Sequence, residues 1–345
     1  MESKRIHFID FAKGFAIFTI VLFHLLQKIH LSPLFQSAIE FGGSGVHLFF
    51  MLSGFGLFMS KRRSPLEFYQ RRFAKIYLPY FLVLTISLLV NFLVPLYHDG
   101  FQAYLAGIFL YQMFFGHFME AFGGHFWFIS TIIQLYLLYP LFAYLHQKLG
   151  DKKFLLLSLF VSASYWVFLS YFDLLLDRSW TCSFLQFFWV FSLGMVLANQ
   201  YKTSGFEFWS FNCKVYILLA IVGVSVATVL LIHWGMVGKV FNDIPVFVGY
   251  TSIAIIAYKF SIRFSSKSFQ IFSKIGEYSY SIYLVHVLII SLLLYALEAA
   301  SIDRNFIIII LFVPFIFLAS WVYAKLSIVF TRFIEKLFSY SNRIL

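Results

Sequence analysis

The sequence has 345 residues, of which 61% are hydrophobic and only 12% are charged. With a mean hydropathy of +0.85, this composition excludes a soluble domain and indicates an integral membrane protein. The formal net charge is +11, but the basic residues form short clusters between apolar segments, as topology signals do, so we expect no nucleic-acid partner.

The first apolar segment, residues 8–29, is too long for the core of a signal peptide and is followed by no small-residue cleavage pattern. We therefore interpret it as a retained helix. Further spans of about 20 apolar residues are expected along the chain, each long enough to cross a hydrocarbon core of about 30 Å. These spans are 43–60, 77–97, 126–146, 154–172, 183–200, 215–233, 244–260, 279–297 and 305–330.

The segment 101–115 is also apolar but is only about 15 residues long, which is marginal for a crossing. If it does not cross and the N-terminus is cytoplasmic, 22 of the 26 basic residues lie on the cytoplasmic side. If it did cross, 13 later basic residues would face outward and 3 inward. The positive-inside rule therefore favours ten spans, with 101–118 as an interfacial or re-entrant element on the outer side.

The fold class predicted from this pattern is all-α: a polytopic bundle of about ten transmembrane helices with both termini cytoplasmic. We expect one integral-membrane domain over residues 1–345, because no segment is left to form a soluble one. The loops are short, so an active site has to be built from helices and the re-entrant element. The two cysteines, Cys182 and Cys213, flank one predicted span, so we expect no disulfide.

Three ionisable residues stand out in the first span, because such groups are costly in hydrocarbon and often functional. His24 lies about 16 Å beyond Lys13 along a straight helix, in the outer half of the membrane. It is either a functional imidazole or a neutral histidine bonded to a neighbouring helix. Asp10 and Lys13 share a face near the cytoplasmic end, as an ion pair, a ligand contact or a helix-start anchor. Asp10 is about 21 Å from His24 and cannot orient it.

The second span and the loop after it carry a histidine, small residues and a dense basic cluster. His47 lies near the outer end of the span, and Ser53 lies deeper beside two glycines that allow close helix packing or a ligand. Residues 61–75 contain six basic residues and one acid. Such a cluster is either a topology signal or a phosphate-binding surface, for which arginine is well suited.

Aromatic and polar residues open two later spans. Trp127 begins the span 126–146 together with His125, where an aromatic belt is the simplest interpretation. The span 279–297 starts with Tyr280 and Tyr283, and His286 follows roughly 10 Å above the cytoplasmic boundary. So many polar groups at one helix start suggest a lined cavity. No close metal-ligand spacing such as HxxxH occurs and no carboxylate is placed to orient an imidazole, so we expect no metal.

Several stretches in this order resemble acyltransferase family three, multi-pass enzymes that acylate bacterial surface glycans. They are "IDFAKGFAIFTIVLFH", "GVHLFFMLSGFGL", "RRFAKIYLPY", "HFWFISTIIQLYLLYP" and "YSYSIYLVHVLI". The spacing of Lys13 and His24 matches the family's most diagnostic element, with lysine in place of the usual arginine. The family's common acidic residue after "GV" is His47 here, and the glutamates that many members carry after the tryptophan motif are Ile132 and Ile133.

The resemblance implies a membrane-bound O-acyltransferase that moves an acyl group, most simply acetyl, from cytoplasmic acyl-CoA to a hydroxyl of a cell-surface or lipid-linked glycan. His24 would be the general base or a transient acyl carrier. Arg71, Arg72, Lys75 and Lys13 would hold the CoA phosphates. Asp10, His47, Trp127 and His286 would support the site, and Ser53, Tyr280, Tyr283 or a backbone N–H would stabilise charge on the thioester oxygen.

The resemblance also implies that acyl-CoA is a co-substrate and that no cofactor is permanently bound. The expected partners are the glycan acceptor, membrane lipid and a possible second copy of the chain, and the expected location is the cytoplasmic (inner) cell membrane. The alternatives are a proton-coupled secondary transporter or lipid flippase and, less favoured, a structural scaffold subunit. A transporter often has repeated halves and paired broken helices, and neither is evident in the sequence.

Overall fold

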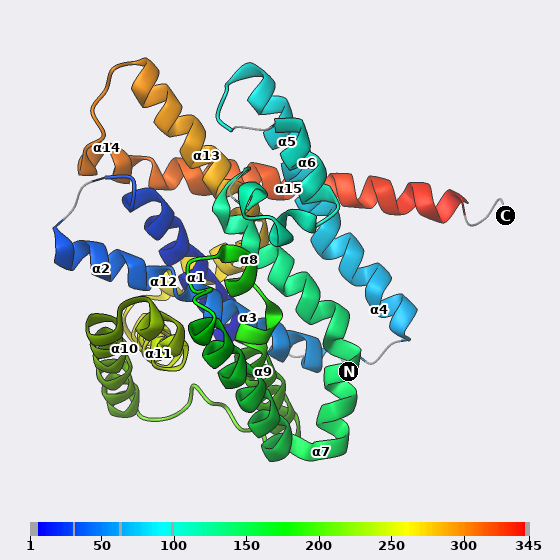
Figure 1. The fold of residues 1–345 in the computed structure, drawn as a ribbon, viewed down its shortest axis with the longest axis vertical. Coiled ribbons are helices and arrows are strands. Elements are labelled where there is room, and N and C mark those ends of the chain that lie inside the picture. The colour runs from blue at the N-terminus through cyan, green and yellow to red at the C-terminus, as the bar shows by residue number, and fades with distance from the viewer. Residues whose placement is uncertain (1–5, 30–31, 62–63, 98–99, 120, 342–345) are drawn as a thin grey trace. The chain divides into compact units, whose positions relative to one another are not determined.

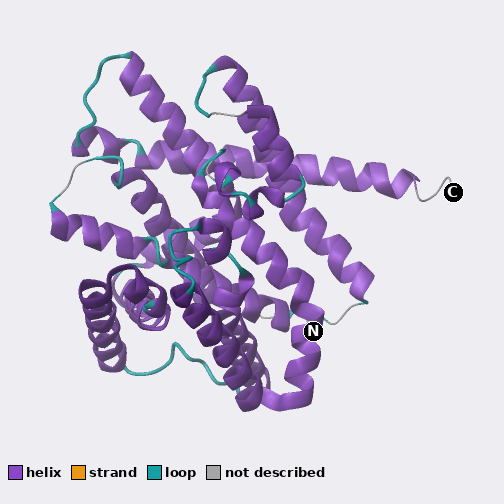
Figure 2. Ribbon diagram, viewed as in Figure 1, coloured by secondary structure: helices purple, strands orange, loops and turns teal. Residues whose placement is uncertain are grey.

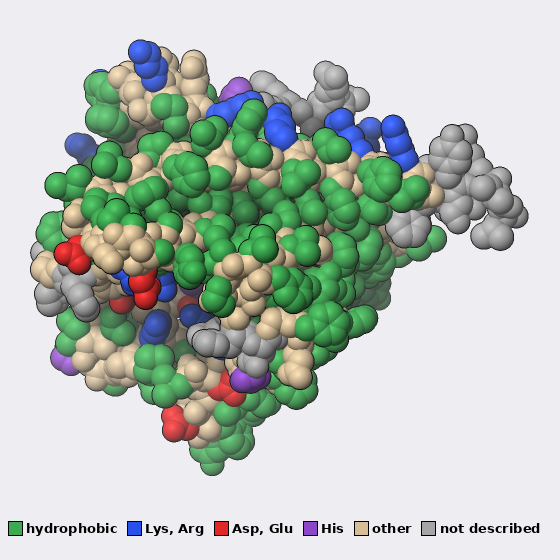
Figure 3. All heavy atoms as spheres, turned by 90° about the horizontal axis from the view of Figure 1, so that it is seen from above, with side chains coloured by type: hydrophobic (Ala, Val, Ile, Leu, Met, Phe, Trp, Pro, Cys, Tyr) green, Lys and Arg blue, Asp and Glu red, His purple; other side chains and the backbone are tan. Residues whose placement is uncertain are grey.

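The computed structural model describes residues 6–29, 32–61, 64–97, 100–119 and 121–341. Within these ranges the chain forms helices joined by loops, and no strand is present (Figure 2). Nine of the described helices are long and apolar enough to cross a membrane. Hydrophobic side chains cover most of the face drawn in Figure 3, and charged side chains are sparse there. The predicted all-α, polytopic fold is therefore confirmed.

The described helices follow the predicted spans closely (Figure 1). They are α1 His7–Leu26, α3 Gly45–Met59, α5 Leu78–Leu93, α7 Trp127–Tyr171, α9 Phe184–Ser204, α10 Cys213–Phe241, α11 Asp243–Phe264, α13 Ser279–Ala299, and the consecutive α14 Phe306–Leu311 and α15 Val313–Ser341. Helix α7 corresponds to two predicted spans, 126–146 and 154–172. The chain breaks between them at Gly150, whose φ is +73°. Two spans on either side of one break account for the difference between nine helices and ten spans.

Four shorter helices were not predicted. They are α2 Pro33–Gly42, α4 Pro65–Arg72, α8 Arg178–Thr181 and α12 Ser266–Glu277. Helix α4 begins where the Ser64 hydroxyl accepts a hydrogen bond from the backbone N–H of Glu67 at 3.3 Å, which caps the helix. It continues through a π-helical turn, Phe73–Tyr77, into α5. A search for long apolar runs passes over such short, partly polar helices.

The chain forms two compact units. The first comprises Met1–Phe23, Leu31–Lys61 and Thr131–Ser279, and the second comprises His24–His30, Arg62–Ser130 and Tyr280–Leu345. Helices α1 and α7 contribute residues to both. That residues 1–345 act as one domain stays a prediction.

Glycine contacts hold the helices of the first unit together. A Cβ atom on Gly14 of α1 would lie 1.8 Å from the Phe272 carbonyl oxygen of α12, and one on Gly276 of α12 would lie 1.8 Å from the Asp10 carbonyl oxygen. Helices α3 and α9 approach in the same way. Glycine is therefore required for the backbones to meet, which is the small-residue packing typical of membrane helices.

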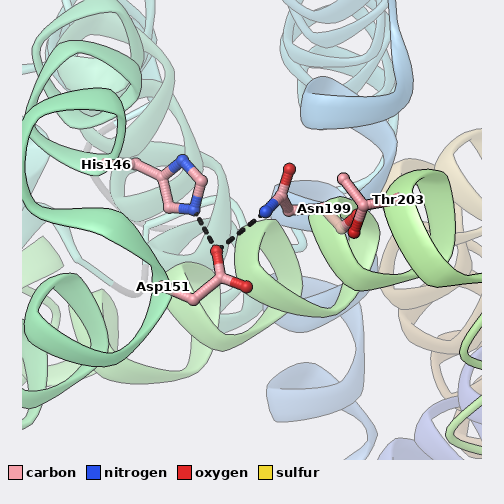
Figure 4. A network of polar contacts seen from close by, with 4 residues as sticks. All are labelled: His146, Asp151, Asn199 and Thr203. Carbon is pink, nitrogen blue, oxygen red and sulfur yellow. Dashed lines mark hydrogen bonds and ion pairs between the residues drawn. The ribbon is translucent and has the colours of Figure 1, made fainter.

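A polar network joins α7 to α9 in the first unit (Figure 4). The Asp151 carboxylate lies directly after the break at Gly150 and accepts hydrogen bonds from His146 Nε2 at 2.6 Å and Asn199 Nδ2 at 3.0 Å. His146 is 7% exposed. Because an unpaired buried polar group costs about 1–3 kcal/mol, this network fixes the break and the helix that follows it.

In the second unit, α6 (Gly100–Ile108) packs against α5. The Tyr77 hydroxyl donates to the Ile108 carbonyl at 2.7 Å, and the Tyr80 hydroxyl donates to the Gly107 carbonyl at 3.2 Å. Both acceptors lie at the end of α6, whereas Tyr77 ends the π-helical turn just before α5 and Tyr80 lies in the first turn of α5. Helix α6 therefore runs back along α5 towards its first turn, and the choice between a re-entrant and an interfacial element stays a prediction.

The chain then turns and returns towards α7. Leu110 adopts a left-handed conformation, with φ of 59°, directly after α6. Three short 3₁₀ turns follow: Tyr111–Phe114, Gly116–Phe118 and Gly124–Phe126. The Gln112 side-chain amide donates to the Tyr80 hydroxyl at 3.1 Å. Irregular backbone at membrane depth is tolerated only where protein groups satisfy it, and these bonds do so.

Candidate functional site

Helix α13 connects the polar features of the second unit. At its start, the Tyr280 hydroxyl donates to the Ile76 carbonyl at 2.7 Å, next to Lys75 in the chain. At 1.5 Å per residue, His286 lies about 9 Å further along the helix and Glu298 about 27 Å from Tyr280. The last distance is close to the thickness of a hydrocarbon core. One helix therefore passes from the basic cluster, past a buried histidine, to the opposite end of the unit.

Three imidazole rings meet beside this helix. His24 comes from the end of α1, His125 from the 3₁₀ turn before α7, and His286 from α13. The ring centroids are 5.2 Å apart for His24 and His286, 5.1 Å for His125 and His286, and 6.4 Å for His24 and His125. His286 is fully buried, His125 is 3% exposed and His24 is half-buried. We call this group the histidine cluster.

The expected depths of these residues need a correction. The sequence placed His24 in the outer half of the membrane and His286 about 10 Å above the cytoplasmic boundary, yet their rings are neighbours. Both estimates counted residues along untilted helices. Each count started from a boundary assigned to one helix alone, and because the two rings meet, those boundaries do not lie at one depth.

Backbone carbonyls fix the orientation of His286. Its Nδ1 lies 2.8 Å from the Tyr283 carbonyl oxygen and 3.1 Å from that of Ile282, so Nδ1 carries the proton and donates. Its Nε2 is then an unprotonated acceptor, and it has no hydrogen-bond partner within the described part of the chain. The cluster therefore contains a buried, oriented lone pair.

His125 is held in the same region by two contacts. Its Nε2 lies 3.3 Å from the Leu284 carbonyl of α13, and its own carbonyl accepts a hydrogen bond from the Tyr283 hydroxyl. Tyr280 and Tyr283 thus both use their hydroxyl protons on backbone carbonyls. In this structure Tyr283 holds the His125 backbone and Tyr280 holds the Ile76 backbone, and their role toward a thioester oxygen stays a prediction.

Gln27 is a side chain that contacts His24 and can orient it. Its amide nitrogen lies 3.1 Å from His24 Nδ1, one turn further along the chain. A side-chain amide fits in either rotation. With its oxygen towards Nδ1, the ring carries its proton there and Nε2 is a base. With its nitrogen towards Nδ1, Nε2 carries the proton. The first arrangement is the one that general-base catalysis requires.

A second polar feature is the basic pocket between α4, the π-helical turn and α15. It has a volume of about 390 Å³ and is lined by Arg71, Arg72, Lys75, Thr331 and Glu335. The three basic residues are three of the four that the sequence predicted for phosphate binding. Arg71 also contacts Glu67 at 3.1 Å, and its side chain remains 61% exposed.

The remaining predicted residues lie at several places in the fold. Asp10 and Lys13 are half-buried on α1, where α1 meets α12, and Ser53 is half-buried on α3 beside the close approach to α9. Trp127 is half-buried at the start of α7. Roles for these four residues stay predictions.

His47 has a partner that the sequence did not predict. Its Nε2 lies 3.1 Å from a carboxylate oxygen of Asp243, at the start of α11. The other carboxylate oxygen accepts from Gln186 at 3.2 Å. The expectation that no carboxylate is placed to orient an imidazole is therefore wrong. Asp243 lies 196 residues beyond His47 and looks like an ordinary helix start in the sequence, so only the fold reveals the contact.

Several site residues were missed for similar reasons. Gln27 lies three residues after His24, and this spacing on one helix was the available signal. Thr331 and Glu335 look like the polar end of a long apolar helix, and nothing in the sequence pairs them with Arg71. Within the described residues, no group of three His, Cys, Asp or Glu side chains is arranged to hold a metal ion.

The apolar helices define a multi-pass membrane protein. Its histidine cluster and basic pocket are ionisable groups of the kind that mark functional sites in membrane proteins. Comparison with protein families gives the particular class. The acyltransferase domain family matches residues 6–325, nearly the whole chain, so the chain belongs to this family and is a membrane acyltransferase. No curated protein and no solved structure matches the chain.

Proposed function

We propose that the protein transfers an acyl group, acetyl in the simplest case, from cytoplasmic acyl-CoA to a hydroxyl of a cell-surface or lipid-linked glycan at the opposite face of the cytoplasmic membrane. The observation that carries the proposal is the order of features along α13. The Tyr280 hydroxyl in its first turn donates to the Ile76 carbonyl, next in the chain to the pocket residue Lys75, and the histidine cluster lies about 9 Å further along.

The basic pocket is the proposed phosphate site for acyl-CoA. Two guanidinium groups and an ammonium group outnumber the single carboxylate, Glu335. Guanidinium groups bind phosphate with paired, charge-assisted hydrogen bonds. The positive-inside rule places this end of the unit in the cytoplasm, where acyl-CoA is made. From there the pantetheine arm would extend along α13 towards His24.

His24 is the proposed general base. Its Nε2 takes the proton of the acceptor hydroxyl while the hydroxyl oxygen attacks the thioester carbonyl. The carbon–sulfur bond then breaks, and the CoA thiolate leaves and takes up the proton from His24. The His286 ring centroid lies 5.2 Å from that of His24, and its unprotonated Nε2 is an acceptor held in a fixed orientation. The transfer would therefore take place next to an oriented polar group. The products are the acylated acceptor and free CoA, and the reaction needs no reactant besides acyl-CoA and the acceptor.

The experiment uses the full chain in lipid nanodiscs and measures acyl-CoA binding and acyl transfer separately. His24→Asn should bind acyl-CoA normally and lose transfer by about 10²–10⁴-fold, the usual contribution of a general base. Wild-type transfer by this variant would refute the assignment of the base. A stable acyl adduct on His24, seen by mass spectrometry, would instead favour a covalent carrier.

The second variant tests the donor site. Arg71→Ala with Arg72→Ala should raise the KM for acyl-CoA about five- to thirtyfold, because each exposed charge contact contributes roughly 0.5–1 kcal/mol. Arg263→Ala is the matched control, since Arg263 is exposed on the predicted cytoplasmic side and does not line the pocket. A protein that binds no acyl-CoA at all would favour a transporter.

A further inference from the structure

A second pocket lies at the far end of α13, beyond the histidine cluster. It has a volume of about 520 Å³, and its charged lining residues are Lys28, Glu298, Asp303 and Arg304. The first follows α1, and the others come from the end of α13 and the loop to α14. The charge distribution of the sequence assigns this end of the unit to the outer side. We call it the outer pocket.

The charges of the outer pocket are balanced but only partly paired. Arg304 contacts Glu298 at 3.1 Å. Neither Lys28 nor Asp303 forms an ion pair within the described ranges of the chain. The pocket therefore presents one unpaired ammonium group, one unpaired carboxylate and one ion pair, with no net charge. Two of the four basic residues assigned to the outer side, Lys28 and Arg304, meet here, which a topology signal does not explain.

Backbone hydrogen bonds shape the rim of the pocket. Ser301 adopts a left-handed conformation, with φ of 53°, and the Ile302 N–H donates to the Leu297 carbonyl at 2.9 Å. The Asn305 side chain caps α14 by accepting from the Ile308 N–H at 3.0 Å. Both ends of this loop are thus held, so the charged side chains project from an ordered rim.

The outer pocket is close to the proposed base. Lys28 follows His24 by four residues, which corresponds to about 6 Å along a helix. The chain keeps a helical path beyond α1, because the N–H groups of Lys28 and Ile29 still bond to the carbonyls of Leu25 and Leu26 at 3.3 Å. A ligand held by Lys28 would lie one turn from the histidine cluster.

We propose that the outer pocket binds the acceptor and that this acceptor is an uncharged saccharide. A sugar hydroxyl both donates and accepts hydrogen bonds, so it suits a pocket that offers both an ammonium group and a carboxylate. A charged sugar gains nothing from a pocket with no net charge, because it meets a like charge wherever it meets an opposite one. The volume falls within the range of about 300–1,000 Å³ usual for small-ligand sites. This inference rests on the proposed function.

The test measures glycoside binding to the full chain in nanodiscs by saturation-transfer NMR, without maltoside detergents. The probes are methyl β-glucoside, which is uncharged, methyl β-glucuronide, which is anionic, and methyl β-glucosaminide, which is cationic. The glucoside should bind best, with an affinity that changes little between low and high salt. Lys28→Gln and Asp303→Asn should each weaken it about fivefold.

Lys239→Gln is the matched control, since Lys239 is exposed, assigned to the outer side and absent from the pocket lining. Its binding should equal that of the wild type. An equal loss in Lys239→Gln, tighter binding of the glucuronide or no glycoside binding at all would overturn the proposal. Acyl-CoA binding is measured on the same samples. If acyl-CoA binds but Lys28→Gln and Asp303→Asn bind the glycoside as tightly as the wild type, this inference fails and the proposed function stands. If acyl-CoA does not bind, the proposed function fails.

Discussion

Gln27→Leu tests whether an amide orients the proposed base. The substitution removes the 3.1 Å contact with His24 Nδ1 and keeps a side chain of similar size. A neutral hydrogen bond contributes about 0.5–1.5 kcal/mol, less at an exposed residue such as Gln27. Since 1.36 kcal/mol corresponds to a tenfold change in rate, kcat should fall about two- to tenfold. The KM for acyl-CoA should not change, because Gln27 lies outside the basic pocket.

The assay is steady-state acyl transfer in nanodiscs, with acyl-CoA varied at a saturating concentration of acceptor. Gln27→Glu should recover most of the rate, because a carboxylate can accept only from Nδ1–H and so selects the arrangement in which Nε2 is the base. Gln270→Leu is the control, since Gln270 is exposed on α12. Equal losses in Gln27→Leu and Gln27→Glu, or no loss in either, would refute the assigned role of Gln27.

Three further outcomes follow from the structure. Glu335→Gln removes the one carboxylate from the basic pocket, so the KM for acyl-CoA should fall about two- to fivefold at low salt and less at high salt; an unchanged KM would place the phosphates elsewhere. Gly54→Ala should lower the melting temperature, because its Cβ would lie 2.1 Å from a carbonyl oxygen of α9, whereas Gly56→Ala in the same helix, with nothing within 4 Å, should not. Asp151→Leu should destabilise the protein by about 1–3 kcal/mol without a specific effect on KM, with the exposed neighbour Lys152→Ala as control; a normal unfolding midpoint would contradict the role of the network.

The fold was largely accessible from the sequence, because spans of apolar residues have few alternative structures in lipid. Charge counting also predicted that the segment 101–118 does not cross the membrane, and α6 is indeed only a nine-residue helix that packs back along α5. The predicted gap between the spans 126–146 and 154–172 contains the break at Gly150, but the sequence did not show that helix continues almost up to it on both sides. Gly150 lies between two charged and polar stretches that look like a loop, and the left-handed conformation keeps helix on both sides.

The candidate site was accessible only where its residues share one helix or one short loop. Arg71 and Lys75 are four residues apart, so their common pocket follows from local geometry. The histidine cluster combines residues 24, 125 and 286, which no periodicity connects. The contact between His47 and Asp243 is similar, because a buried carboxylate at a helix start has the same sequence signature as an ordinary N-terminal acid.

The hairpin formed by α5 and α6 has a consequence for how the chain is inserted. Helix α6 has nine residues, too few to span the bilayer, and two of its last carbonyl groups accept hydrogen bonds from Tyr77, just before α5, and from Tyr80 of α5. It therefore cannot be released into lipid by the insertion machinery before α5 is in place. Biogenesis of this part of the protein has to proceed in chain order, as one α5–α6 unit.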